Sequence, residues 1–220
     1  MAGDERGVVR RALGELRYAT TLRVLPPRVA AFQWRARRVA RAHGEHFSLT
    51  SATRPRDLAA LLELARGRRR VVELGTGMGW TAISFALADR ERRITTFDPS
   101  SYAERGRYLE LAAPQVLERI RFASEPGSRG PLDGDRVDLL YIDSSHEREG
   151  TLAELRAWWG ALRPGALVVF DDYTHPDFPG VREAIEELGL DGVQRGTLFV
   201  HAVGLGQPQA VENGAPVKEG

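Results

Sequence analysis

Three glycines at alternate positions, Gly75, Gly77 and Gly79, follow an apolar segment that contains Glu73. Because glycine has no Cβ and tolerates positive φ, such a turn can bring bare backbone against a ligand. The dinucleotide fingerprint Gly-x-Gly-x-x-Gly needs glycine at its sixth position, where this chain has Trp80. The acid before the turn also suits a cationic ligand better than a pyrophosphate. The pattern therefore favours S-adenosylmethionine, whose sulfonium and ammonium groups are positive, over NAD.

Further cofactor contacts are expected in the loops that follow the next strands. Asp98 could accept hydrogen bonds from both ribose hydroxyls, although NAD enzymes also use an acid at this position. Ser124 and Glu125 lie where adenine contacts are expected, and a solvated loop acid is the alternative for Glu125. Ser51 could cover the methionine end of the cofactor or cap the next helix. The expected cofactor residues are Ser51, Glu73, Gly75, Thr76, Gly77, Gly79, Trp80, Asp98, Ser124 and Glu125.

Three aspartates and a histidine follow two later apolar segments: Asp143 and His146 after the first, Asp171 and Asp172 after the second. Carboxylates packed closely raise each other's pKa unless a cation neutralises them. All-oxygen ligation suits Mg²⁺, so we expect Asp143, Asp171 and Asp172 to hold this ion. His146 could be a general base, since its unperturbed pKa of roughly 6.5 leaves it mostly neutral near pH 7. The alternatives are helix-capping aspartates and a structural histidine.

Strand-like and helix-like segments alternate after residue 70. Two of the strands, 137–142 and 166–170, are near-continuous apolar runs, as expected for strands covered on both faces. The alternation predicts an α/β fold with a parallel sheet between helices. The expected strands are 71–75, 93–98, 119–123, 137–142, 166–170, 193–195 and 197–203. The expected helices are 27–41, 55–67, 79–88, 102–112, 147–162 and 180–188, with Pro114 ending the fourth and Pro164-Gly165 forming a turn.

The length of 220 residues predicts one main domain. We expect a helical extension over 1–45, the ligand-binding domain over 46–204 and a disordered tail over 205–220. The chain has no cysteine, which excludes disulfides and thiolate metal sites. Its net charge of +1 gives no electrostatic footprint for nucleic acid. No apolar run approaches the ~18 residues of a membrane helix, and no signal peptide is recognisable, so we expect a cytoplasmic protein that does not bind membranes.

These segments together resemble the class I S-adenosylmethionine-dependent methyltransferases, and most of all the small-molecule O-methyltransferases that act on sugars and natural products. The resemblance spans roughly residues 48–203. It is carried by Glu73-Leu-Gly-Thr-Gly-Met-Gly79, Phe97-Asp98, Asp138-Leu-Leu-Tyr-Ile-Asp-Ser-Ser-His146 and Leu162-Arg-Pro-Gly-Ala-Leu-Val-Val-Phe-Asp-Asp-Tyr173.

This resemblance implies a Rossmann-like, doubly wound and mostly parallel seven-stranded sheet whose final strand is antiparallel. In metal-dependent relatives, a strand-end aspartate and a later Asp-Asp pair hold Mg²⁺, and Asp143, Asp171 and Asp172 match those positions. Some relatives carry a second acid as a base two residues after the first, where this chain has Ser145, and His146 is the substitute we expect. The N-terminal 45 residues match nothing specific; in such families this region often covers the acceptor pocket or mediates dimerisation, so a homodimer is an open expectation.

The resulting hypothesis is methyl transfer from S-adenosylmethionine to a hydroxyl of a small molecule, such as a sugar, natural product or phenol, with help from Mg²⁺. One alternative is a metal-independent methyltransferase in which His146 is the base for O or N acceptors. The others are an NAD-binding oxidoreductase and a non-catalytic protein that keeps the cofactor cleft.

Overall fold

Seven strands form one sheet in the order β3-β2-β1-β4-β5-β7-β6. The computed structural model describes residues 14–132, 134 and 136–204. Neighbouring strands are parallel from β3 to β5, whereas β7 runs antiparallel to both β5 and β6. The strands are β1 (Arg70–Leu74), β2 (Arg93–Phe97), β3 (Ile120–Ala123), β4 (Val137–Ile142), β5 (Leu162–Phe170), β6 (Val193–Arg195) and β7 (Leu198–Ala202). The predicted mostly parallel, seven-stranded sheet with an antiparallel final strand is confirmed.

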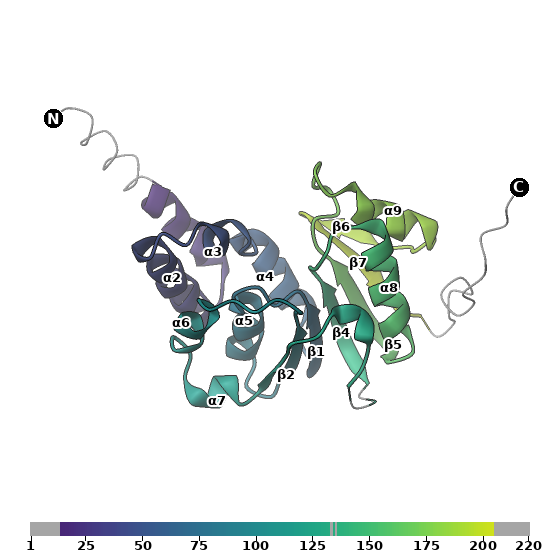
Figure 1. Ribbon diagram of the computed structural model, residues 1–220, viewed down its shortest axis with the longest axis horizontal. Helices are drawn as coiled ribbons and strands as arrows, with labels where there is room; N and C mark the ends of the chain where they lie inside the picture. The colour runs from purple at the N-terminus through teal and green to yellow at the C-terminus, as the bar shows by residue number, and fades with distance from the viewer. Residues whose placement is uncertain (1–13, 133, 135, 205–220) are drawn as a thin grey trace, which may run out of the picture.

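Helices cover both faces of this sheet (Figure 1). The segments on one side are η1 (Leu22–Val24), α2 (Pro27–Ala42), α3 (His46–Thr50), α4 (Pro55–Leu64), α5 (Trp80–Ala88), α6 (Arg105–Leu109) and α7 (Pro114–Leu117). Those on the other side are η2 (Gly127–Arg129), α8 (Arg148–Trp159) and α9 (Pro179–Glu187). The doubly wound arrangement expected from the alternation is therefore confirmed.

Alternation along the central strand β4 builds two separate hydrophobic clusters. Leu139 and Tyr141 point to the cluster formed with α2, α4 and α5. Leu140 and Ile142 point to the cluster formed with α8 and α9. Successive side chains of a strand face opposite sides of the sheet, so a strand that is covered on both faces has no polar face to show. The continuous apolar run of β4 follows from this position.

The N-terminal extension packs into the first of these clusters. Leu25, Val29 and Phe32 are buried together with side chains of α5 and β1. The boundary predicted at residue 45 stays a prediction, and the expected tail 205–220 lies outside the described residues. Within the part of the chain that the structure describes, no helix has both the length and the apolar character needed to cross a bilayer.

Two prolines act differently from the expectation. The helix expected over 102–112 is α6, which ends at Leu109, and Pro114 begins α7 instead of ending a helix. Proline fits the first turn of a helix because its missing N–H would be unpaired there. The other exception is Pro164-Gly165, which lies inside β5 and not before it. Gly165 has φ +80°, and its N–H donates to Val203 O at 2.8 Å, so the chain kinks while the strand continues.

The order of the strands reverses between β1 and β4. From β1 the chain proceeds outward to β2 and β3, and then returns across β1 to β4 and β5. In open α/β sheets, ligands bind beyond the carboxyl ends of the strands at such a switch point. The loops after β1, β4 and β5 therefore meet where a ligand site is expected.

Candidate functional site

The glycine turn after β1 packs against the loop after β4. Gly75 has φ +99°, and a Cβ on it would lie 1.8 Å from the carbonyl oxygen of Asp143. Its N–H donates to Phe97 O at 2.8 Å, while Asp143 N–H donates to Leu74 O at 2.8 Å. Only glycine fits this position, because a side chain would clash with backbone and strain φ. The turn thus joins the ends of β1, β2 and β4.

A cavity of about 770 Å³ opens beside this turn. Its volume lies within the range of roughly 300–1,000 Å³ that is typical of small-molecule sites. The predicted site residues on its wall are Ser51, Gly75, Thr76, Gly77, Trp80, Asp98, Asp143, His146, Asp171 and Asp172. The predicted residues that do not line it are Glu73, Gly79, Ser124 and Glu125.

Glu73 lies beneath the cavity wall, within β1, and is 1% exposed. Its Oε2 accepts a hydrogen bond from Thr96 Oγ1 at 2.5 Å, and Thr96 Oγ1 in turn lies 2.7 Å from Thr76 Oγ1. Burial raises the pKa of Glu73 to about 8, although the Thr96 hydrogen bond works against the rise. The side chain is thus a neutral acid that braces the turn near pH 7. The predicted contact with a cofactor ammonium stays a prediction.

Asp98 ties the glycine turn to the loop after β2. Its Oδ2 accepts from Gly77 N–H at 2.8 Å, and its Oδ1 accepts from Ser100 N–H at 2.8 Å. Arg105 donates to Gly77 O at 2.8 Å and lies 3.5 Å from Asp98 Oδ2. The carboxylate reaches the cavity wall but already serves two backbone amides, and its predicted role with the ribose stays a prediction.

The loop after β3 reaches the cavity with other residues than expected. Glu125 forms an ion pair with Arg129, one turn further along the chain. The residues of this loop on the wall are Pro126, Gly127 and Ser128. Ser124 and Glu125 themselves do not line the cavity, and the predicted contact of this loop with adenine stays a prediction.

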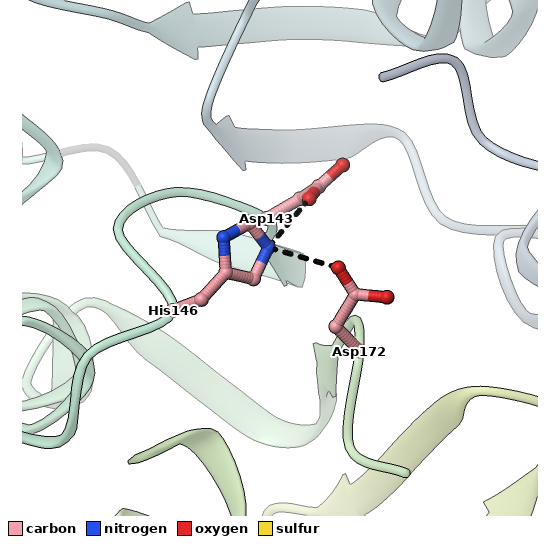
Figure 2. A group of neighbouring side chains, drawn as sticks. All are labelled: Asp143, His146 and Asp172. Carbon is pink, nitrogen blue, oxygen red and sulfur yellow. Dashed lines mark hydrogen bonds and ion pairs between the residues drawn. The ribbon is translucent and has the colours of Figure 1, made fainter. Parts of the chain in front are cut away.

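Asp143, His146 and Asp172 meet at the carboxyl ends of β4 and β5 (Figure 2). Figure 2 shows one ring nitrogen of His146 directed between the two carboxylates. This atom, Nε2, lies 3.2 Å from Asp143 Oδ1 and 3.3 Å from Asp172 Oδ2. A nitrogen that faces two carboxylate oxygens satisfies them only when it carries a proton. The ring therefore stands between the acids as a hydrogen-bond donor.

The charges of this cluster shift the pKa values of its members. Burial raises the pKa of Asp143 to about 6, against the hydrogen bond from His146, and the charge of Asp171 adds to the rise. Burial lowers the pKa of His146, but the hydrogen bond to Asp143 and the surrounding negative charges outweigh it, so the pKa is raised. Burial and the charge of Asp171 raise the pKa of Asp172. The cluster thus favours an imidazolium that neutralises the acids.

Asp171 is held by donors of the protein. Its Oδ2 accepts from the Tyr141 hydroxyl at 2.6 Å, and its Oδ1 accepts from Thr197 Oγ1 at 3.0 Å and from Asp172 N–H at 2.8 Å. The same Tyr141 hydroxyl lies 3.1 Å from Asp143 Oδ2. The three potential metal-ligand atoms within 4.8 Å of one another come from Asp143, His146 and Asp172. His146 thus lies beside two of the three predicted Mg²⁺ ligands, and the prediction that Asp171 also binds the ion stays a prediction.

The cavity wall beside His146 contains an aromatic stack that the sequence analysis missed. Phe178 stacks on His146, with ring centroids 4.5 Å apart, and on His175, at 4.6 Å. All three side chains line the cavity. Phe178 precedes α9 in a proline-containing loop, where no local pattern predicts which way a ring points.

A hydroxyl pair and a buried acid were also missed. Thr53 Oγ1 and Thr81 Oγ1 lie 3.0 Å apart on the wall near the start of α5. Glu154 lines the cavity from α8 and is 6% exposed. It lies on the same stripe of α8 as the buried Thr151, Leu155 and Trp158. The helical periodicity of the sequence could have revealed Glu154, because it places this acid on the apolar face of an amphipathic helix.

Comparison with known protein families gives a match over the segment that carries this site. A family profile described as "Methyltransferase domain" matches residues 72–173. The chain carries a methyltransferase domain. This segment of the methyltransferase domain begins in β1 and ends just after Asp172, so it contains the glycine turn and the whole Asp143–His146–Asp172 cluster. The prediction of a class I methyltransferase is confirmed.

Solved structures share the fold of this methyltransferase. An O-methyltransferase from Bacillus cereus in complex with SAH is 16% identical, with a TM-score of 0.61, and the match covers 79% of this chain and 90% of that chain. The O-methyltransferase TomG from Streptomyces achromogenes, in complex with SAM and involved in tomaymycin synthesis, is 24% identical, with a TM-score of 0.56 and coverage of 77% and 89%.

A third structure is CalS11, a TDP-rhamnose 3'-O-methyltransferase of calicheamicin biosynthesis. It is 21% identical, with a TM-score of 0.55 and coverage of 72% of this chain and 84% of that chain. No curated protein matches the chain.

Proposed function

We propose that this methyltransferase transfers the methyl group of S-adenosylmethionine to a hydroxyl of a small molecule. The observation that carries the proposal is that one cavity holds both the glycine turn and the Asp143–His146–Asp172 cluster. The turn presents backbone to an anion beside the start of α5, which suits the methionine carboxylate. The cluster lies on the neighbouring strand ends, where an acceptor would reach the sulfonium.

The cluster can take the proton that the acceptor hydroxyl loses. A carboxylate whose pKa is raised toward neutrality is a stronger base than an ordinary aspartate. His146 keeps the two acids close together and limits their repulsion, because its Nε2 is shared between them. Much of the rate acceleration then comes from holding the hydroxyl oxygen in line with the sulfonium methyl group. We assign the proton-accepting role to the cluster, with Asp143 and Asp172 as bases and His146 as their cation.

The residues also fit a divalent cation. Asp143 and Asp172 offer oxygen ligands. Proteins commonly bind Mg²⁺ with one or two carboxylates, while water molecules fill the other coordination positions. His146 Nε2 is a third potential ligand in the same space, once it has lost its proton. When bound, the ion would lower the pKa of the acceptor hydroxyl and help to orient it. An imidazolium and a cation compete for the same two acids, so the ion would bind more weakly at low pH.

The acceptor is proposed to be a sugar, a natural product or a phenol. Phe178 and His175 supply flat faces beside the cluster, and Thr197 and Arg54 add polar groups on the same wall. The direct test is incubation of the protein with methyl-labelled S-adenosylmethionine and a panel of vicinal diols, catechols and sugars, with and without Mg²⁺. Label in an ether product, lost in Asp143→Asn, would support the proposal. Label in amines alone would contradict the hydroxyl as acceptor.

A further inference from the structure

Glu154 is a buried acid on the cavity wall that the proposed transfer step does not use. It belongs to α8 and lies on that helix's apolar stripe. A buried carboxylate costs free energy unless hydrogen bonds compensate for its lost hydration. An oxygen of Glu154 that has no donor within the protein therefore indicates where a ligand could donate a hydrogen bond.

The two oxygens of Glu154 differ in their surroundings. Oε2 accepts from Ser144 Oγ at 2.5 Å, which fixes the carboxyl group against the loop after β4. Among the described residues, no hydrogen bond reaches Oε1. Oε1 lies over Gly127, where an added Cβ would come within 2.7 Å of it. One oxygen is thus anchored, and the other is left for a donor that the protein does not supply.

The cavity wall around Glu154 is lined by small residues, and we call this part of the cavity the slot. Trp158, also in α8, donates from Nε1 to Gly127 O at 2.8 Å and holds the loop after β3 against the helix. Gly150 and Ala153 line the cavity on the helix side. A Cβ on Gly150 would lie 2.0 Å from Ser145 Oγ, so a larger residue would displace the loop after β4. Such a slot suits a flat ring between the two loops.

The position of the slot within the cavity indicates which part of the cofactor fills it. The start of α5, with Trp80 and Thr81, lies on one side of the sheet, and Glu154 lies on the other. Asp98, the candidate for the ribose, follows β2 between the glycine turn and the loop after β3. With the methionine part at α5 and the ribose at Asp98, the purine reaches the slot.

We propose that Glu154 recognises the purine of the cofactor, with Oε1 accepting a hydrogen bond from the 6-amino group of adenine. This inference rests on the proposed function, because it requires the nucleoside of S-adenosylmethionine in this cavity. It moves the acidic adenine contact from Glu125, which pairs with Arg129, to a residue of α8. Recognition by an anchored carboxylate selects a purine that carries a donor at position 6.

Calorimetric titration with two ligands tests the proposal: S-adenosylhomocysteine and its 6-deamino analogue, in which hydrogen replaces the amino group. The wild type is expected to bind S-adenosylhomocysteine about tenfold or more tightly than the analogue, as for loss of a hydrogen bond to a charged group. In Glu154→Met the two affinities should become equal, while the affinity for the analogue stays near that of the wild type. Glu149→Gln is the matched control, because Glu149 lies in the same helix with its side chain 77% exposed.

Each outcome decides a separate point. Equal affinities in the wild type, or an unchanged ratio in Glu154→Met, would overturn the role of Glu154 and leave the proposed function intact. Absence of binding of either ligand to the wild type would overturn the proposed function as well. If Glu154→Met does not fold, Glu154→Gln decides, because the amide keeps the size and an acceptor oxygen but not the charge. Its ratio should fall by roughly half on a logarithmic scale, since charge-assisted hydrogen bonds are about twice as strong, and an unchanged ratio would count against the proposal.

Discussion

His146 and Asp172 are neighbours on the cavity wall and share the same unusual backbone conformation. His146 has φ +56° and Asp172 has φ +52°, and among the described residues they are the two non-glycine residues with positive φ. Their side chains meet with Nε2 and Oδ2 3.3 Å apart. A left-handed backbone costs a non-glycine residue free energy and tends to persist at functional sites. The loops after β4 and β5 thus each hold one partner of this contact in a conformation that few non-glycine residues adopt.

Replacement of Asp143 or Asp172 should strongly reduce turnover without weakening cofactor binding. In Asp143→Asn or Asp172→Asn the acceptor proton has no base, and we expect kcat to fall by about 10²-fold or more. The affinity for S-adenosylhomocysteine should stay within about threefold of the wild type, because Asp98 and the glycine turn are unchanged. Steady-state kinetics and calorimetry measure both quantities. The matched control is Asp177→Asn, an exposed acid nearby. Normal turnover in both cluster variants would contradict the assignment.

The pH dependence of kcat/KM should report the cluster. A carboxylate base is active when deprotonated, and burial raises the pKa of Asp143 to about 6, so kcat/KM should rise with pH through about 6. In His146→Gln the two acids face no cation, so their mutual repulsion should raise their pKa values. The rise of kcat/KM should then occur at higher pH than in the wild type. If kcat/KM rises at the same pH in the variant as in the wild type, His146 does not stabilise the charged acids.

Mg²⁺ should bind in competition with the proton on His146. Calorimetric titration of metal-stripped protein, saturated with S-adenosylhomocysteine, should show one site that weakens as the pH falls through the raised pKa of His146. Asp172→Ala should remove the site. In Asp171→Asn the site should remain, because the Asp171 oxygens serve Tyr141, Thr197 and the Asp172 amide. Loss of binding in Asp171→Asn alone would restore Asp171 to the metal set.

Glu73→Gln should stabilise the protein at alkaline pH. The folded protein keeps the Glu73 proton up to a pKa of about 8, whereas a glutamate in the unfolded chain has its ordinary pKa of 4.5. The resulting contribution to stability is complete below pH 4.5 and is lost as the pH rises through 8. The neutral amide avoids this loss, so the variant should be more stable than the wild type by roughly 2–4 kcal/mol at pH 8 and similar at pH 4.

Urea unfolding at both pH values measures this difference, and Glu91→Gln at an exposed ion pair is the control. A stability difference that does not change with pH would mean that Glu73 is ionised in the folded protein.

Gly75→Ala should be far more damaging than Gly77→Ala. The Cβ at position 75 would lie 1.8 Å from Asp143 O, with φ +99°, whereas at position 77, with φ +48°, it would meet nothing within 4 Å. The second substitution costs only left-handed strain, about 1–2 kcal/mol, while the first also displaces the β4 loop. Thermal unfolding compares the two, and equal losses would contradict the close approach of the turn to β4.

Local patterns predicted most of the framework. The strand at 137–142 is β4 as it stands in the sequence, because an apolar run of this length between turn residues leaves few alternatives. The glycine turn and the strand-end acids were also located correctly, since parallel strands bring their carboxyl ends to one edge whatever their order. Proline was less informative, because its ring fits a helix start or a kinked strand as well as a stop, as Pro114 and Pro164 show.

The sequence by itself determined the fold class, the edge of the sheet that carries the site and the residue types available there. Tertiary structure alone decided which of these side chains meet. In the folded protein Glu73 is buried beneath the cavity wall. Asp171 accepts hydrogen bonds from Tyr141 and Thr197. His146 lies between Asp143 and Asp172. The physical reason is that hydrophobic period and turn chemistry are local, whereas the direction of a side chain depends on strand register, loop strain and partners far away in the chain.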